Sequence, residues 1–151
     1  MTQNSAQTPD WQLHDDEGFL GLIGPVWEDR AADQLVLAFT AEDKHSNQRG
    51  TVQGGMLMTL ADRVMGHALR LHLEGEPVAT IQLDTHFLEA AWAGDWIEAR
   101  ARLTRVTRSV VFIEGVLDSG DRRLMQANGV WKRLRDDDGK ASARFQARFM
   151  R

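Results

Sequence analysis

The residues that follow Gly54 place apolar side chains on nearly every face of the helix that their spacing predicts. These side chains are Met56, Leu57, Met58, Leu60, Ala61, Val64, Met65, Ala68, Leu69, Leu71 and Leu73. At about 100° per residue they leave no wide polar stripe. We therefore expect a helix over roughly residues 54 to 72 that is buried inside the protein.

A single carboxylate, Asp62, interrupts this apolar run. Burying an ionised carboxylate without a partner is costly, so Asp62 must be paired with a cation, hydrogen-bonded, exposed at a cleft or functional. Gly55, Thr59 and Gly66 fall on the same strip of the helix and are small, which leaves room for another molecule. An ion pair with a distant arginine and a functional carboxylate both fit this pattern.

Gly54 and Gly55 stand where this helix is expected to begin. The first amides of a helix have no internal acceptor and lie at the positive end of its dipole, so they can polarise a carbonyl or hold an anion. Glycine lets a ligand approach the backbone closely. The alternative is that the two glycines only permit a tight turn into the helix.

Strand-like segments surround the helix, and Glu74 to Pro77 provides a stop signal after it. The segments cover residues 34–40, 80–88, 97–103, 110–117 and 124–134. In the second of them, Ile81, Leu83, Thr85 and Phe87 alternate with polar residues, so we expect these four on one face, against the helix. The order favours an α+β fold in which an antiparallel sheet curls around one long helix. Such a sheet has open edges, so we expect at least a dimer.

Composition limits the classes of function. A chain of 151 residues with 42% hydrophobic and 26% charged residues is typical of one globular domain. A net charge of -4 argues against general nucleic-acid or membrane-surface binding. There is no cysteine, and we see no metal site. Without a signal-peptide pattern or an apolar span of membrane length, we expect a cytoplasmic protein.

The chain divides into three predicted parts. Residues 1–16 are expected to be a flexible N-terminal segment because they are polar. Residues 17–134 hold the strands and the helix, and residues 135–151 form a C-terminal tail of unsettled structure.

The segment HSNQRGTVQGG, from His45 to Gly55, together with Leu60, Asp62 and Gly66, carries a recognisable pattern. It resembles the H-x-N-x-x-G-x-x-H-G-G signature of hotdog-fold acyl-CoA thioesterases of the phenylacetate-degradation (PaaI-like, 4-hydroxybenzoyl-CoA thioesterase) type, whose catalytic acid follows the second glycine by seven residues. Asp62 has that spacing. The likeness extends in character over roughly residues 20 to 134.

The resemblance implies a hotdog fold and hydrolysis of an acyl-CoA thioester without a cofactor. In its terms, Asp62 is the general base or the nucleophile and the Gly54 amide polarises the thioester carbonyl. Asn47 and Thr80 help to hold the attacking water. Asp62 and Thr80 are expected to face Asn47 and Gly54 across an interface between two chains, in a dimer or a dimer of dimers.

Four further residues are predicted to bind substrate: His45, Gln53, Gly55 and Arg108. Position 53 departs from the family pattern, because glutamine can donate and accept hydrogen bonds but carries no proton charge near neutral pH. Arg108 is chosen from a set of basic residues expected at the ends of the last three strands, where guanidinium groups suit the phosphates of coenzyme A. That set is Arg105, Arg108, Arg122, Arg123, Lys132 and Arg133.

Other classes of protein were weighed against this hypothesis. A non-catalytic acyl-CoA binding or sensing module could keep the fold, but it would have no need of Asp62. A serine hydrolase of the G-x-S-x-G type is excluded because that motif is absent. A DNA-binding regulator would need a helix-turn-helix, for which the first 20 residues leave no space.

Overall fold

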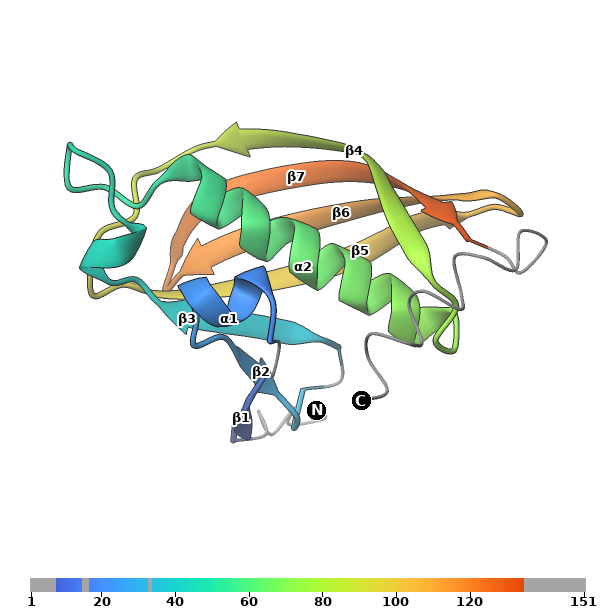
Figure 1. Cartoon of the computed structure of the whole chain (residues 1–151), viewed down its shortest axis with the longest axis horizontal. Coiled ribbons are helices and arrows are strands. Elements are labelled where there is room, and N and C mark those ends of the chain that lie inside the picture. Colours follow the sequence, from blue (N-terminus) through green and yellow to red (C-terminus); the bar gives the residue numbers. More distant parts are fainter. Residues whose placement is uncertain (1–7, 15–16, 33, 135–151) are drawn as a thin grey trace, which may run out of the picture.

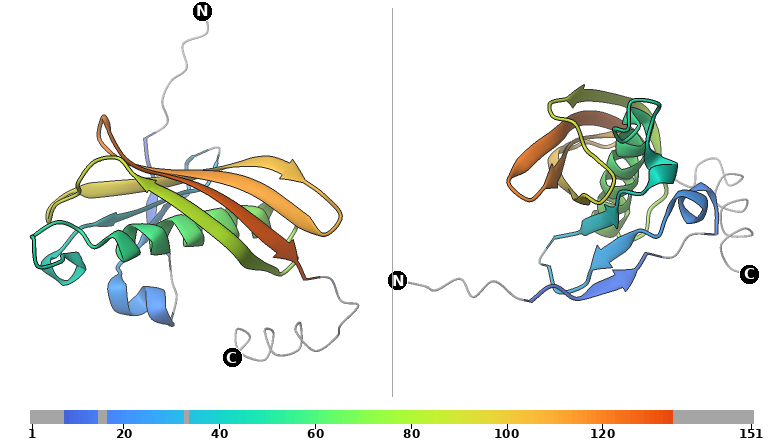
Figure 2. Two further views of the ribbon diagram at one scale, coloured as in Figure 1. Left: turned by 90° about the horizontal axis from the view of Figure 1, so that it is seen from above. Right: turned by 90° about the vertical axis from the view of Figure 1, so that its left-hand side faces the viewer.

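The computed structural model describes residues 8–14, 17–32 and 34–134, and the chain forms one antiparallel sheet and one long helix. Its elements are β1 (Trp11–Leu13), α1 (Phe19–Ile23), β2 (Trp27–Asp29), β3 (Val36–Thr40), a short 3-10 turn (Asp43–His45), α2 (Gly54–His72), β4 (Val78–Phe87), β5 (Trp96–Val106), β6 (Val110–Ser119) and β7 (Arg122–Arg133). The strand order is β1-β2-β3-β5-β6-β7-β4. The sheet curls around α2, as the end-on view of Figure 2 shows. This confirms the predicted α+β architecture.

Helix α2 begins at Gly54 and ends at His72, which are the predicted limits. Its buried side chains are Met56, Leu57, Leu60, Ala61, Val64, Met65 and Leu69. Each of the larger ones contributes roughly 1.5–3 kcal/mol when it is fully removed from water. The helix stops where Gly75 takes a φ of 90° and its amide donates a 2.7 Å hydrogen bond to the Arg70 carbonyl.

The core lies between α2 and the concave face of the sheet (Figure 1). Phe39, Ile97, Ile113 and Trp131 reach it from β3, β5, β6 and β7. The last three strands form long continuous ladders, so they provide a firm floor under the helix.

Strand β4 lies at the edge of the sheet and carries a bulge. Among the described residues it pairs only with β7, and the register shifts between Thr80 and Gln82. The extra residue is Ile81, which is 57% exposed, whereas Leu83 packs against the core. The prediction that Ile81 shares the helix-facing side with Leu83 is therefore wrong. Because the bulge reverses the alternation, Thr80 and Leu83 both face α2.

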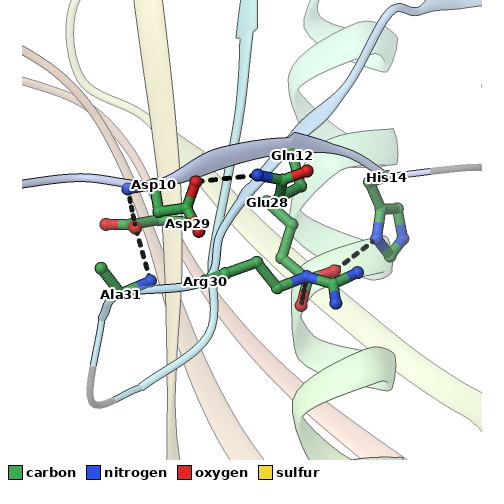
Figure 3. Close-up of polar contacts among 7 residues, drawn as sticks. All are labelled: Asp10, Gln12, His14, Glu28, Asp29, Arg30 and Ala31. Carbon is green, nitrogen blue, oxygen red and sulfur yellow. Dashed lines mark hydrogen bonds and ion pairs between the residues drawn. The ribbon is translucent and has the colours of Figure 1, made fainter.

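The N-terminal residues form a small hairpin on the opposite edge. Trp11–Leu13, which fall in the segment predicted to be flexible, form β1 and pair with β2. Asp29 Oδ1 fixes the end of this hairpin by accepting hydrogen bonds from the amides of Asp10 and Ala31, each 2.9 Å long (Figure 3). A strand of three residues is too short to be recognised from alternation.

The structure describes the two ends of the chain only in part. The C-terminal tail over residues 135–151 lies outside the described residues, as do residues 1–7. Among the helices of the described part, none has both the length and the apolarity to cross a membrane.

Candidate functional site

Asp62 lies in the middle of α2 and is held by the edge strand β4. Thr80 Oγ1 donates a 2.7 Å hydrogen bond to Asp62 Oδ1. Asp62 is half-buried, and in the described part of the chain no cation lies within ion-pair distance of it. The ion-pair alternative thus has no partner here. A carboxylate that accepts one hydrogen bond and keeps its other oxygen free can still accept a proton.

A cavity of about 180 Å³ opens beside Asp62. Its walls are Asp62, Arg63, Gly66, His67 and Arg70 of α2, Val78 and Thr80 of β4, and Trp131 of β7. The cavity therefore brings Asp62 and Gly66 of the predicted strip together with the basic side chains of Arg63 and Arg70.

His67 is a neutral member of this wall. The pKa of His67 is lowered to about 4, mainly by burial and also by the nearby His14, Arg63 and Arg70, against an opposing effect of Glu28. The imidazole is therefore uncharged near neutral pH and can offer one donor and one acceptor.

His14, on the N-terminal hairpin, connects this wall to the opposite edge of the sheet. Arg63 Nε donates a 2.9 Å hydrogen bond to His14 Nε2. The proton of the ring is then on Nδ1, which lies 3.1 Å from Glu28 Oε2 (Figure 3). The His14 and His67 rings meet edge to face with centroids 5.0 Å apart. This network fixes the turn of α2 that follows Asp62.

His14, Glu28 and His67 could also be considered as metal ligands, since their donor atoms lie within 4.8 Å of one another. A metal on His14 Nδ1 would move the ring proton to Nε2, where it would point at the Arg63 donor. Ligating histidines normally donate that second N–H to an acceptor. We therefore assign no metal to this cluster.

The start of α2 offers free backbone donors. In the described part of the chain the amides of Gly54 and Gly55 have no acceptor, as expected for the first turn of a helix. Gln53 is the N-cap residue, and its exposed side chain makes no capping hydrogen bond. It can therefore turn toward a bound molecule.

Phe87 packs on this helix start from the end of β4. A Cβ added to Gly54 would lie 3.0 Å from Phe87 Cζ, so the ring of Phe87 would have to shift by a few tenths of an ångström to admit it. Phe87 and Gly54 line a second cavity of about 270 Å³ together with Val52, Leu57 and Leu88 among others. This cavity, lined by both apolar side chains and polar groups, thus meets the free amides.

His45 and Asn47 are used within their own loop. His45 is 4% exposed, its Nε2 donates to the Ile23 carbonyl at 2.5 Å, and its Nδ1 accepts from the Glu42 amide at 2.9 Å. Neither ring nitrogen is left for a substrate, so in this structure His45 braces the loop. Asn47 donates to Thr51 Oγ1 and accepts from the Arg49 amide, each at 2.9 Å, which fixes a turn.

The basic residues predicted to gather at the strand ends are divided between the two ends of the sheet. Arg122 bonds to Asp95 at 2.7 Å at one end. At the other end Arg133 bonds to Glu76 at 2.6 Å, and Arg108 lies on the exposed β5–β6 turn beside it. Arg108 is thus close to the C-terminal end of α2, whereas Gly54 starts that helix. The six basic residues lie at strand ends, as predicted, but within one chain they do not form a single cluster.

Asp62 and Gly54 are also apart within one chain. They are eight residues apart on one helix, which corresponds to about 12 Å along its axis. A single thioester carbonyl cannot contact two groups that are this far apart. One chain therefore cannot bring both groups to the same carbonyl.

Sequence reasoning missed Phe87 and Trp131 as residues of the two cavities. Trp131 had a recognisable signal, because Gly129 precedes it by two residues on a strand. A Cβ at Gly129 would lie 2.1 Å from the Trp131 ring, so the indole lies flat over that glycine. Phe87 carried no such signal.

Comparisons with known proteins show the family to which the chain belongs. A family model described as the Thioesterase superfamily matches residues 49–126. A Pseudomonas aeruginosa protein named as a candidate esterase is 37% identical over 114 residues, which cover 74% of this chain and 85% of that protein. Mouse acyl-coenzyme A thioesterase 13 is 26% identical over 82 residues, covering 54% of this chain and 59% of that protein.

A solved structure extends the likeness to the fold. It is a Ralstonia eutropha protein described as a candidate thioesterase related to phenylacetic acid degradation. It is 30% identical and has a TM-score of 0.69, covering 78% of this chain and 91% of that one. The predicted hotdog fold is thereby confirmed, and the chain belongs to the Thioesterase superfamily, as a thioester hydrolase.

Proposed function

We propose that this protein hydrolyses the thioester of an acyl-CoA, with Asp62 as the acid–base or nucleophilic group. The observation that carries the proposal is the half-buried Asp62 carboxylate, which has a hydroxyl donor on one oxygen and an open cavity beside it. The name of the mouse relative supports the choice of an acyl-CoA as the substrate.

The site is completed by a second chain. The β4 edge is ten residues long and unpaired on its outer side, and it exposes Ile81 and Phe87, the latter 52% exposed. Two-fold pairing of this edge would run the two α2 helices in opposite directions. The start of one helix then approaches the middle of the other, so Asp62 and Thr80 of one chain meet Gly54 of the second. A dimer or a dimer of dimers satisfies this requirement.

In the reaction, the Gly54 amide donates to the thioester oxygen as negative charge develops there. Asp62 either takes the proton of an attacking water or attacks the carbonyl carbon itself, forming an anhydride that water then opens. The C–S bond breaks and coenzyme A leaves as the thiolate, which takes up a proton. Thr80 fixes the carboxylate in both routes.

The remaining predicted residues take supporting roles. Gln53 and Gly55 line the carbonyl end of the site, and Asn47 fixes the loop that leads to it. Arg108 is solvent-exposed and can meet phosphate groups, although it lies about a helix length from Gly54 of its own chain.

The test is release of free thiol from a panel of acyl-CoAs by the wild-type protein and by Asp62→Asn. The amide is nearly the same shape but is neither a base nor a nucleophile, so we expect turnover at least ~100-fold slower with binding retained. Asp121→Asn is the matched control, because Asp121 is an exposed carboxylate in the β6–β7 turn, away from the edge strand proposed to join the two chains. If Asp62→Asn were destabilised yet fully active per folded molecule, the assignment would be wrong.

A further inference from the structure

Trp131 brings an unused hydrogen-bond donor to the cavity beside Asp62. The residue is 2% exposed, and in the described part of the chain its indole N–H has no acceptor. The nitrogen faces α2, because Nε1 is the nearest atom to the place where a Gly66 Cβ would lie. The indole N–H is open to the cavity, where a bound molecule can offer it an acceptor.

Gly66 keeps the same cavity open. It lies in the interior of a 19-residue helix, one turn after Asp62, where glycine is less favourable than alanine. A Cβ at this position would meet Trp131 Nε1 at 3.5 Å, which is an ordinary contact. Neither the backbone nor the packing requires glycine here. What the missing side chain provides is space between Asp62 and Trp131.

We propose that Trp131 and Gly66 form the subsite for the acyl group, and that this group is compact and carries an oxygen acceptor beyond its carbonyl. This inference rests on the proposed function. The indole N–H donates to the acceptor, and Gly66 gives the acyl chain room to lie along α2. The open cavity measures about 180 Å³ within one chain, which is room for one ring or a short acyl chain.

The position of the cavity favours the acyl group over the pantetheine arm. The arm is long and flexible and must lead out to the phosphates, whereas this cavity is small and lies between α2 and two strands. The two sources of an acceptor predict different results. If the acceptor is on the acyl group, Trp131→Phe lowers kcat/KM only for the substrates that carry it. If the acceptor is on the pantetheine arm, which all substrates share, Trp131→Phe lowers kcat/KM equally for every substrate.

The experiment compares matched pairs of acyl-CoAs, such as butanoyl with 3-hydroxybutanoyl and acetyl with hexanoyl. Trp131→Phe removes the donor and is expected to lower kcat/KM about tenfold for the hydroxylated member only. Gly66→Ala fills the cavity and is expected to lower kcat/KM for six-carbon chains while sparing acetyl-CoA. Its melting temperature should rise, because alanine favours the helix. Equal losses on all substrates, or no loss for either variant, would overturn the subsite.

A binding measurement separates failure of the subsite from failure of the proposed function. The indole N–H signal of Trp131 is identified in the proton–nitrogen NMR spectrum by its absence in Trp131→Phe. Short hydroxy acids should shift this signal in the wild type and not in Gly66→Ala. If the wild type hydrolyses no acyl-CoA, the proposed function fails while this shift still supports the cavity as a binding site. If the signal does not shift, the subsite is wrong even in an active enzyme.

Discussion

Thr80 Oγ1 lies 2.7 Å from Asp62 Oδ1, and this contact exists because β4 carries a bulge immediately after Thr80. A regular strand that placed Leu83 against the core would turn Thr80 toward the opposite face. The bulge adds one residue, Ile81, and thereby turns Thr80 back toward α2. Strand β4 thus holds the carboxylate of Asp62, which belongs to helix α2.

Removing this hydrogen bond should impair the reaction without unfolding the protein. Thr80→Val keeps the shape and the strand preference of the side chain, so we expect an unchanged melting temperature and kcat/KM lower by about tenfold. Thr80→Ser restores the hydroxyl and should recover most of the rate. If Thr80→Val and Thr80→Ser had equal activity, the hydroxyl would have no part in the chemistry.

Much of the fold could be predicted because long periodic segments determine it. The run with apolar residues on all faces predicted the limits of α2 correctly, and the strand-like segments after it form β4 to β7. The bulge at Ile81 could not be predicted, because alternation assumes a regular strand. The pairing of Trp11–Leu13 was missed for a different reason, since three residues show no period.

The residues of the candidate site could be predicted when they belong to one continuous segment of the sequence. Residues that meet only through the packing of distant strands could not. Asp62 and Gly54 were found because both belong to one helix and its entry turn. Trp131 was missed because its role depends on where β7 passes α2. The basic residues at the strand ends lie apart, because successive antiparallel strands end alternately at opposite ends of a sheet.

His67 should make stability depend on pH in a defined window. In the unfolded chain a histidine titrates near 6.5, whereas the pKa of His67 in the folded protein is about 4. Between these values the unfolded state binds the proton and the folded state does not. The free energy of unfolding therefore falls as the pH falls from 6.5 to 4 and is highest above 6.5.

The measurement is chemical unfolding of the wild type and His67→Gln at several pH values. The variant lacks this titration, so the wild type should lose about 1 kcal/mol more than His67→Gln between pH 6.5 and 4, a value reduced for the partial exposure of the ring. Parallel curves for the two proteins across this window would contradict the prediction.

Gln53→His restores the residue typical of the family at an exposed N-cap whose side chain makes no capping bond. We expect a change in unfolding free energy below about 0.5 kcal/mol and a change in rate below about tenfold, because glutamine already donates and accepts hydrogen bonds. The new imidazole should add a titration near pH 6.5 to the rate profile. Complete loss of turnover would show that the groups facing the carbonyl have been misassigned.

A site shared between two chains predicts that two inactive variants can restore each other. Gly54→Pro removes the amide donor, and proline is well tolerated at the first helical position. The preceding residue, Gln53, already has φ -57° and ψ 131°, which suits a following proline. Gly54→Ala is the control, since it adds the same Cβ against Phe87 but keeps the N–H.

Alone, Gly54→Pro and Asp62→Asn should each lose at least ~100-fold in kcat, whereas Gly54→Ala should lose much less. When the two inactive chains are co-expressed, about half of the dimers are mixed, and each mixed dimer contains one site with both an intact amide and an intact carboxylate. Activity should then return to about a quarter of the wild-type value. The thiol-release rate of the purified mixture measures this directly. A mixture as inactive as its two components would show that Asp62 and Gly54 do not act together across the interface.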